Sequence, residues 1–222
     1  MLSGGGDPKA YIMGLLLSLP IILLALSLHE TAHGYVAYRL GDPTARNLGR
    51  LTLNPIKHLD PIGFLCMLFA GFGWANPVPI NTRNFKKPRR DMAISAAAGP
   101  VSNLLLALIF TALYKVFILV TPHIAITSEA TFNVLYAINI FIYYGISLNI
   151  SLAVFNLLPV PPLDGSRLFY VFLPPKYYFG VMKYERYISL GIMILLLVGV
   201  LDPALSFVRG GIMNFFFLIF GI

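Results

Sequence analysis

The chain has 222 residues, of which 58% are hydrophobic and only 11% are charged. Soluble domains average about 45–50% apolar and about 25% charged residues, so a single water-soluble core could not bury this much apolar surface. The same composition excludes intrinsic disorder, because disordered chains are polar and highly charged. Together with a mean hydropathy of +0.79, it predicts an all-α polytopic membrane protein.

The charge and the cysteine content narrow the class further. One cysteine, Cys66, rules out an internal disulfide framework and any cysteine-based metal cluster. A net charge of +7 fits a membrane better than nucleic acid, because basic residues gather in cytoplasmic loops and face anionic headgroups. We therefore expect the lipid bilayer as a partner and no nucleic acid; no oligomeric state is predicted.

The first predicted element is a long apolar helix. Residues 11–28 form an apolar run of 18 residues, enough to cross most of a hydrocarbon core of about 30 Å. The helical pattern continues to about Leu40, where Gly41-Asp42-Pro43 ends it. A loop with several basic residues follows.

The next apolar stretch, residues 61–82, is uncharged but is interrupted by three glycines and two prolines. These breakers disfavour a spanning helix exposed to lipid. Basic residues flank the stretch on both sides, so both of its ends are expected on one face of the membrane. We predict a membrane-associated re-entrant element or β-hairpin that is buried against protein.

Two clear spans and a weaker pair of segments complete the chain. The second span is predicted over residues 92–120. The third lies in the charge-free interval of 34 residues between Glu129 and Asp164 and ends near Leu158. Residues 187–201 and 204–222 form the weaker pair, since their charge-free parts are short for a crossing. The expected total is about five transmembrane helices.

The chemistry begins with His29-Glu30-Thr31-Ala32-His33 at the end of the first apolar run. Two histidines at i and i+4 lie on one helix face and can share an ion, while Glu30 is offset and can reach a water molecule at the metal. The alternative is a helix end in the headgroup region with merely solvated side chains. Metal binding is favoured, because ionisable residues beside an apolar span are costly and usually functional.

Two histidines do not complete a zinc site, since a catalytic zinc typically has three protein ligands and keeps a position for water. Among the acidic residues other than Glu30, Asp164 is the one that directly follows a spanning segment. Prolines before it stiffen the backbone, and Gly165 permits close approach. Asp164 could instead cap a helix N-terminus, and the residues alone leave both roles open.

These motifs together resemble the site-2 protease family of intramembrane zinc metalloproteases (peptidase family M50). The resemblance covers roughly residues 15–167 and is specific because the motifs occur jointly in this order. Its motifs are the embedded His-Glu-x-x-His, Gly99-Pro100-x-x-Asn103, and the block Asn156…Pro159…Leu163-Asp164-Gly165. The stretch Trp74-Ala75-Asn76-Pro77-Val78-Pro79 also resembles the family's membrane-associated β-hairpin.

The resemblance implies a site for one Zn²⁺ per chain, held by His29, His33 and Asp164, with Glu30 as the catalytic acid and base. It implies a three-helix catalytic core. We expect one membrane-embedded peptidase domain over residues 1–222, with its core at about 11–167 and C-terminal helices at about 178–222. The loop near residues 121–131 is too short for a PDZ domain, and no CBS domain is expected.

The resemblance also implies residues that contact substrate. Asn156 matches an asparagine near the scissile carbonyl and could donate to the developing oxyanion, or instead form a hydrogen bond between helices. Asn103 is expected to satisfy a backbone group or to orient the site. An unwound substrate segment could pair by strand addition with the hairpin edge at Asn76, Pro77, Val78, Pro79 and Ile80.

The expected function is a zinc endopeptidase that hydrolyses peptide bonds in transmembrane segments of membrane-protein substrates, as in regulated intramembrane proteolysis. The alternatives are a non-catalytic membrane metal-binding protein or transporter, and a binder of transmembrane segments. A retained Glu30 favours catalysis, because metal storage would not need it.

The charge distribution predicts the orientation. Loops 41–91 and 159–186 hold most of the Lys and Arg residues, whereas residues 121–131 hold none. The positive-inside bias then places the active site toward the cytosolic face of a prokaryotic cytoplasmic membrane. His58 and His123 fall in loops and are expected to be surface histidines.

Overall fold

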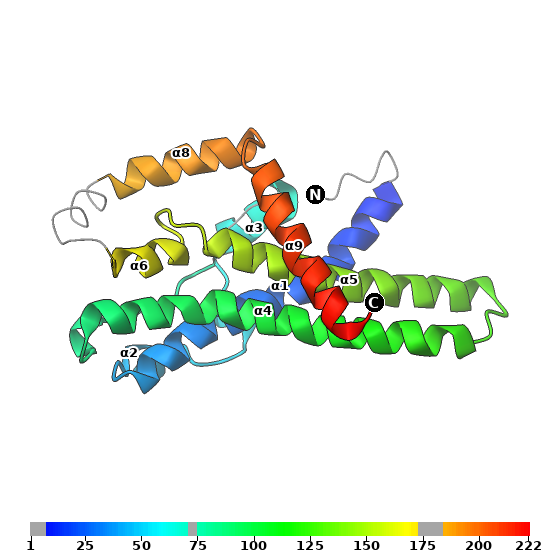
Figure 1. The fold of residues 1–222 in the computed structure, drawn as a ribbon, viewed down its shortest axis with the longest axis horizontal. Coiled ribbons are helices and arrows are strands. Elements are labelled where there is room, and N and C mark those ends of the chain that lie inside the picture. The colour runs from blue at the N-terminus through cyan, green and yellow to red at the C-terminus, as the bar shows by residue number, and fades with distance from the viewer. Residues whose placement is uncertain (1–7, 71–74, 173–183) are drawn as a thin grey trace.

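The computed structural model describes residues 8–70, 75–172 and 184–222, and this part of the chain is helical (Figure 1). Four of its helices are long and apolar enough to cross a membrane: α1 (Pro8–Arg39), α4 (Pro88–Val120), α5 (Glu129–Asn156) and α9 (Asp202–Phe220). The predicted class, an all-α polytopic membrane protein, is confirmed. The shorter α-helices are α2 (Thr44–Asn47), α3 (Pro61–Ala70), α6 (Asp164–Tyr170) and α8 (Glu185–Leu197), and 3₁₀ turns lie at Pro55–Lys57, Thr82–Asn84 and Thr121–His123.

The expected total of about five transmembrane helices is not confirmed within the described residues. The helix α8 has 13 residues. At 1.5 Å per residue it is about 20 Å long, short of a hydrocarbon core of about 30 Å. Residues 178–183, which the prediction assigned to the C-terminal helices, lie outside the described part, as do Lys176 and Lys183.

The predicted re-entrant element is described only in part. Its first half is α3, and residues 71–74, including Trp74 of the expected hairpin, lie outside the described residues. The following chain forms an isolated antiparallel bridge between Leu59 and Ala75, and no strand is assigned among the described residues. The β-hairpin therefore stays a prediction; residues 76–81, which follow the bridge, have no regular secondary structure.

The helices α1, α4 and α5 pack against one another and form the centre of the molecule. In Figure 1, α4 and α5 run side by side in opposite directions, α1 crosses them, and α9 lies across α5. Gly145 on α5 allows the Phe110 ring of α4 to pack directly against the backbone, where a side chain would collide. The buried cluster consists of Ala25, Leu106, Ala107, Phe110, Ile142, Ile146, Ile150, Val154 and Phe216.

The outer face of α4 is apolar. Large side chains at helical spacing are exposed there: Val101, Leu105, Ile109, Leu113 and Val116. In water such a ridge would be an aggregation hazard, whereas in lipid it is the expected surface. The chain is an integral membrane protein, whose three central helices determine where the polar residues meet.

Candidate metal and catalytic site

The helix α1 carries the first three site residues. His29 and His33 lie one turn apart on the face that packs against α4, and their ring centroids are 4.5 Å apart. His29, Glu30 and His33 are only 6%, 9% and 7% exposed. The alternative of a solvated helix end is therefore wrong, because these side chains are buried among neighbouring helices.

Asp164 completes the cluster from the first residue of α6. Its Oδ2 lies 3.1 Å from Nε2 of His29 and 3.2 Å from Nε2 of His33, and the two Nε2 atoms are 3.0 Å apart. The helix α6 begins after Leu163 without a side-chain capping bond, so Asp164 does not serve as a capping residue there. The tight turn depends on Gly165, because a side chain would collide with the carbonyl groups of Leu157 and Leu158.

The electrostatics favour an anionic Asp164. Burial of the carboxyl group by itself would raise its pKa, but the hydrogen bonds and the proximity of His29 and His33 outweigh burial and hold the pKa below the usual range. A charged carboxylate beside two imidazole nitrogens is the donor set that zinc takes in catalytic sites.

Each histidine is oriented through its other ring nitrogen. Nδ1 of His29 lies 2.6 Å from Oδ1 of Asn103, and Nδ1 of His33 lies 2.7 Å from the carbonyl oxygen of Ser95. Both acceptors are on α4, and they leave the two Nε2 atoms free to bind a metal. Both contacts expected for Asn103 are present: its Oδ1 lies beside Nδ1 of His29, and its Nδ2 lies 3.5 Å from the backbone carbonyl of Ala25.

The three residues fit a zinc ion. Ligand atoms about 2.1 Å from a tetrahedral ion lie about 3.4 Å from one another. The candidate atoms on His29, His33 and Asp164 all lie within 4.8 Å of one another. Space beside the rings is provided by Gly99 of α4, where a Cβ would lie 2.6 Å from Nε2 of His29.

Glu30 of α1 lines a small cavity together with His29, His33 and Asp164, but its carboxylate is bonded to a backbone group and not to these three residues. Its Oε2 accepts a hydrogen bond of 2.8 Å from the backbone N–H of Val78. The cavity has a volume of about 160 Å³. It lies between the candidate metal ligands, residues 77–80 and α6. The lining residues are His29, Glu30, His33, Pro77, Val78, Ile80, Asn156, Pro162, Leu163, Asp164 and Arg167.

Further hydrogen bonds hold residues 76–81 beside the cavity. The N–H of Asn76 donates to the carbonyl of His58 over 2.8 Å, and Arg50 donates to the carbonyl of Asn76 over 2.7 Å. At the other end, the N–H of Asn81 donates to Oδ2 of Asp42 over 2.7 Å. The segment is thus attached to the loop after α1 at both ends and to the Glu30 carboxylate in the middle.

Asp42 is the buried anchor of this arrangement, and sequence reasoning gave it no role beyond helix termination. Burial raises the pKa of its carboxyl group, but hydrogen bonds from Thr44, Asn84 and the amide of Asn81 lower it more. The net effect is a pKa below the usual range, so the anchor is an anion. The available signal was an acidic residue between Gly41 and Pro43, and it did not reveal which group Asp42 binds.

Asn156 lines the cavity at the end of α5. Its Nδ2 donates to the carbonyl of Leu152 on its own helix over 3.0 Å. Among the described residues, Asn156 forms no side-chain hydrogen bond to another helix, which was the alternative. Donation to an oxyanion stays a prediction.

The expectation of two surface histidines is half wrong. His123 is exposed, but His58 is only 1% exposed, and its Nε2 lies 2.7 Å from the carbonyl of Thr52. The hydroxyl of Thr31 donates to the same carbonyl. The loop therefore folds back over α1 and buries His58, a tertiary contact that no local pattern predicts.

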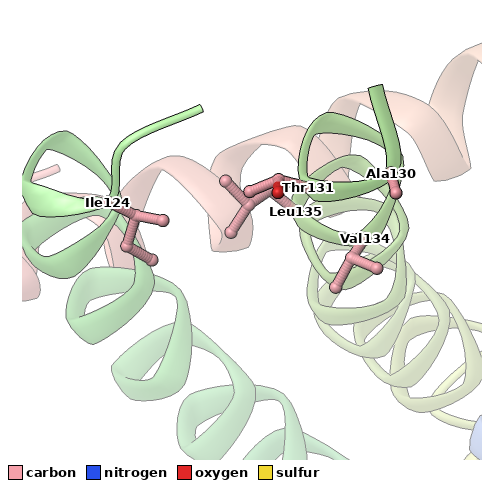
Figure 2. Close-up of a pocket in the computed structure, with 5 residues that line it drawn as sticks. All are labelled: Ile124, Ala130, Thr131, Val134 and Leu135. Carbon is pink, nitrogen blue, oxygen red and sulfur yellow. The ribbon is translucent and has the colours of Figure 1, made fainter. Parts of the chain in front are cut away.

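A second, larger cavity lies at the opposite end of α4 and α5. Figure 2 shows its five lining residues on the loop after α4 and on the first turns of α5. The cavity has a volume of about 410 Å³ and is lined by Ile124, Ala130, Thr131, Val134 and Leu135. None of these side chains carries an imidazole, thiol, carboxylate or amine, so none offers a usual zinc ligand or a group that titrates near neutral pH.

Comparison with known proteins identifies the family. The model of peptidase family M50 matches residues 17–200. The protein named "Putative zinc metalloprotease YwhC" from Bacillus subtilis (strain 168) is 43% identical over 204 residues, which cover 90% of each chain. "Putative zinc metalloprotease Rip2" from Mycolicibacterium smegmatis is 28% identical over 204 residues, covering 90% of this chain and 72% of its own. "Putative zinc metalloprotease MJ0611" from Methanocaldococcus jannaschii is 30% identical over 151 residues, covering 67% and 71%. No solved structure matches the chain significantly.

Proposed function

The chain belongs to peptidase family M50, and on that premise we propose that it is a zinc endopeptidase that hydrolyses peptide bonds in the transmembrane segments of other membrane proteins. One observation carries the proposal. The candidate metal ligands His29, His33 and Asp164 share one cavity with Glu30, between helices that are long enough to span a membrane.

His29, His33 and Asp164 would hold the metal. A bound zinc ion supplies Lewis acidity, lowering the pKa of water and polarising a carbonyl group. Glu30 takes a proton from the attacking water and later delivers it to the leaving amine. Its position in the cavity, outside the cluster of ligand atoms, supports this role.

Residues 76–80 are proposed to hold the substrate. A peptide bond in an intact helix is shielded by the helix's own hydrogen bonds, so the substrate must unwind near the site. Pro77 and Pro79 have no N–H, and Val78 and Ile80 border the cavity next to Glu30. The N–H of Val78 is already bonded to Glu30, so an unwound strand would pair with the N–H of Ile80 and the carbonyl of Val78 and would lie beside the Glu30 carboxylate.

Asn156 is proposed to donate to the oxyanion that develops on the scissile carbonyl. Its side chain lies in the cavity at the end of α5, and its present acceptor is a backbone carbonyl of the same helix. Turning the amide toward the cavity would exchange that acceptor for the substrate oxygen.

The test uses purified protein and a single-span helical substrate in proteoliposomes. Cleavage is expected with zinc, should stop on treatment with a chelator, and should return when zinc is restored. The Glu30→Gln variant is the matched control, since it keeps the metal ligands. Zinc binding without cleavage would favour a silent metal-binding protein. Stable substrate binding without turnover would favour a binder of transmembrane segments.

We also propose that the site faces the cytosol of a prokaryotic cell. The basic residues around α2 and before α4 lie at the end of the molecule that holds the site, and the loop of Figure 2 lies at the other end. Single cysteines at the exposed positions Ser128 and Lys87, in a Cys66→Ala background, test this orientation. An impermeant reagent outside intact cells should label position 128 and spare position 87; the reverse pattern would invert the topology.

A further inference from the structure

Two buried asparagine side chains connect the candidate metal ligand His29 to α5 through hydrogen bonds. Oδ1 of Asn103 on α4 accepts from Nδ1 of His29 on α1 over 2.6 Å. Nδ2 of Asn103 lies 3.0 Å from Oδ1 of Asn149 on α5, and Nδ2 of Asn149 donates over 2.8 Å to the carbonyl of Gly145. Both asparagines are 0% exposed, so no water competes for these hydrogen bonds.

The direction of every hydrogen bond in this relay is determined from its far end. The carbonyl of Gly145 can only accept, so Asn149 must turn its NH₂ group toward it and its Oδ1 toward Asn103. Asn103 must then present its NH₂ group to Asn149 and its Oδ1 to His29. An oxygen at that position requires a proton on Nδ1 of His29, which leaves the Nε2 lone pair for the metal.

We infer that Asn149 is a positioning residue for the metal site: through Asn103 it fixes the tautomer and orientation of His29. The inference rests on the proposed zinc site and extends it to the third central helix. Without the Asn149 oxygen, the remaining acceptor of the Asn103 NH₂ group is the carbonyl of Ala25, 3.5 Å away at the limit of hydrogen bonding. The Asn103 amide could then rotate and present its NH₂ group to His29. Nδ1 would then act as the acceptor, the proton would move to Nε2, and His29 would lose its metal-binding lone pair. The cost of forming the site thus depends on a residue that touches no ligand atom.

Asn149→Ser is the discriminating variant. A serine hydroxyl can donate to the carbonyl four residues earlier, as Ser151 does to Ser147 over 2.8 Å, but it is too short to reach Asn103. The substitution therefore removes the relay bond while its own polar group stays satisfied. Thr111→Val is the matched control, since Thr111 is equally buried and bonds only to the carbonyl of Ala107.

The measurement is the zinc dissociation constant, obtained by chelator competition in detergent at fixed pH, so that it does not depend on proteolysis. We expect Asn149→Ser to weaken zinc binding by about tenfold to hundredfold, the range found when outer partners of metal ligands are removed. Thr111→Val should leave it unchanged. In an Asn103→Ala background, Asn149→Ser should have no further effect, because the relay is already broken.

Wild-type affinity in Asn149→Ser, or an equal loss in both backgrounds, would overturn the inference, because a general packing effect would persist without Asn103. Asn149→Asp provides a second variant if the serine protein does not fold. Its buried carboxyl is expected to stay protonated, to accept from Asn103 and to retain wild-type zinc affinity. Loss of zinc in folded Asn149→Asp would also contradict the relay. A wild-type protein that binds no zinc would instead reject the proposed site itself.

Discussion

The cavities at the two ends of the α4–α5 pair differ in the chemistry of the side chains that line them, and this difference indicates which end holds the candidate site. At one end, a cavity of about 410 Å³ is lined by four aliphatic side chains and one threonine (Figure 2). At the other, a cavity of only about 160 Å³ collects two histidines, two carboxylates, an asparagine and an arginine. Volume alone would choose the wrong end. Convergent polar groups, whose burial must be compensated by hydrogen bonds or ions, are the better guide.

The difference extends to the hydrogen bonds around each end. The polar cavity is surrounded by buried side chains that bind one another across elements, including Asn103, Asn149 and Asp42. At the apolar end, the hydrogen bonds between Ser128 and Thr131 join residues three positions apart and are exposed. A satisfied network of buried hydrogen bonds fixes the positions of metal ligands and catalytic groups. An apolar cavity provides only hydrophobic contact area.

Replacing the proposed catalytic carboxylate, Glu30, should have the largest effect on cleavage. Glu30→Gln is expected to lower cleavage by at least about 10²–10⁴-fold, because glutamine keeps the shape but cannot transfer a proton. Zinc content and helicity should stay at the wild-type level, as judged by metal analysis and circular dichroism. Full activity in this variant would remove Glu30 from the mechanism.

A methyl group at Gly99 tests how tightly the polar end is packed. Gly99→Ala would place Cβ 2.6 Å from Nε2 of His29, so the histidine rings must move. We expect zinc affinity to fall by about a hundredfold or more, beyond the effect of losing an outer partner. Gly210→Ala on α9 is the control, because nothing lies within 4 Å of the added atom. Equal zinc affinities in the two variants would show that the rings tolerate the methyl group.

Neutralising Asp42 should have a moderate effect that depends on pH. The folded-state pKa of Asp42 is lowered, so its contribution to stability is present above the unfolded value of about 3.9 and is lost as pH falls through the folded value. Asp42→Asn should cost about 1–3 kcal/mol at neutral pH, because buried donors lose a charged acceptor. Thermal unfolding in detergent should show this gap closing below about pH 4. A gap that is constant with pH would mean that the charge does not matter.

Filling the apolar cavity should have the smallest effect. Ala130→Phe adds a ring beside Val134 at the end remote from the metal cluster, and we expect less than about a twofold change in cleavage, since exposed substitutions away from a site are usually near neutral. A tenfold loss would show that the apolar cavity takes part in substrate binding, and the contrast between the two ends would fail.

Much of the fold and the centre of the site could be predicted from sequence, for local reasons. Charge-free apolar runs located α1, α4 and α5, because lipid imposes length and composition on a spanning helix. The i, i+4 spacing put His29 and His33 on one face. Asp164 needed the family resemblance as well, since the residues alone also allowed a capping role.

The remaining features depend on tertiary contacts that leave no pattern in the sequence. The acceptor for Nδ1 of His33 is the backbone carbonyl of Ser95. Every residue has a backbone carbonyl, so no residue type in the sequence marks this partner. His58 is buried because its loop folds over Thr31, and Asp42 was assigned only to the end of a helix although it holds Asn81. Asn149 lies inside an apolar run. A single amide side chain in such a run predicts a hydrogen bond to another group, but the sequence does not show which group.

We propose that His29, His33 and Asp164 form a zinc site at the polar end, and zinc-edge X-ray absorption on the purified protein tests this directly. Such a site gives two imidazole ligands at about 2.0–2.1 Å, oxygen ligands at about 2.0–2.2 Å and no sulfur shell. In a parallel sample, Asp164→Asn should lose zinc under mild chelation that the wild type withstands, because a neutral ligand replaces an anion. A sulfur shell near 2.3 Å, which would implicate Cys66, or a spectrum without two imidazoles, would contradict the account.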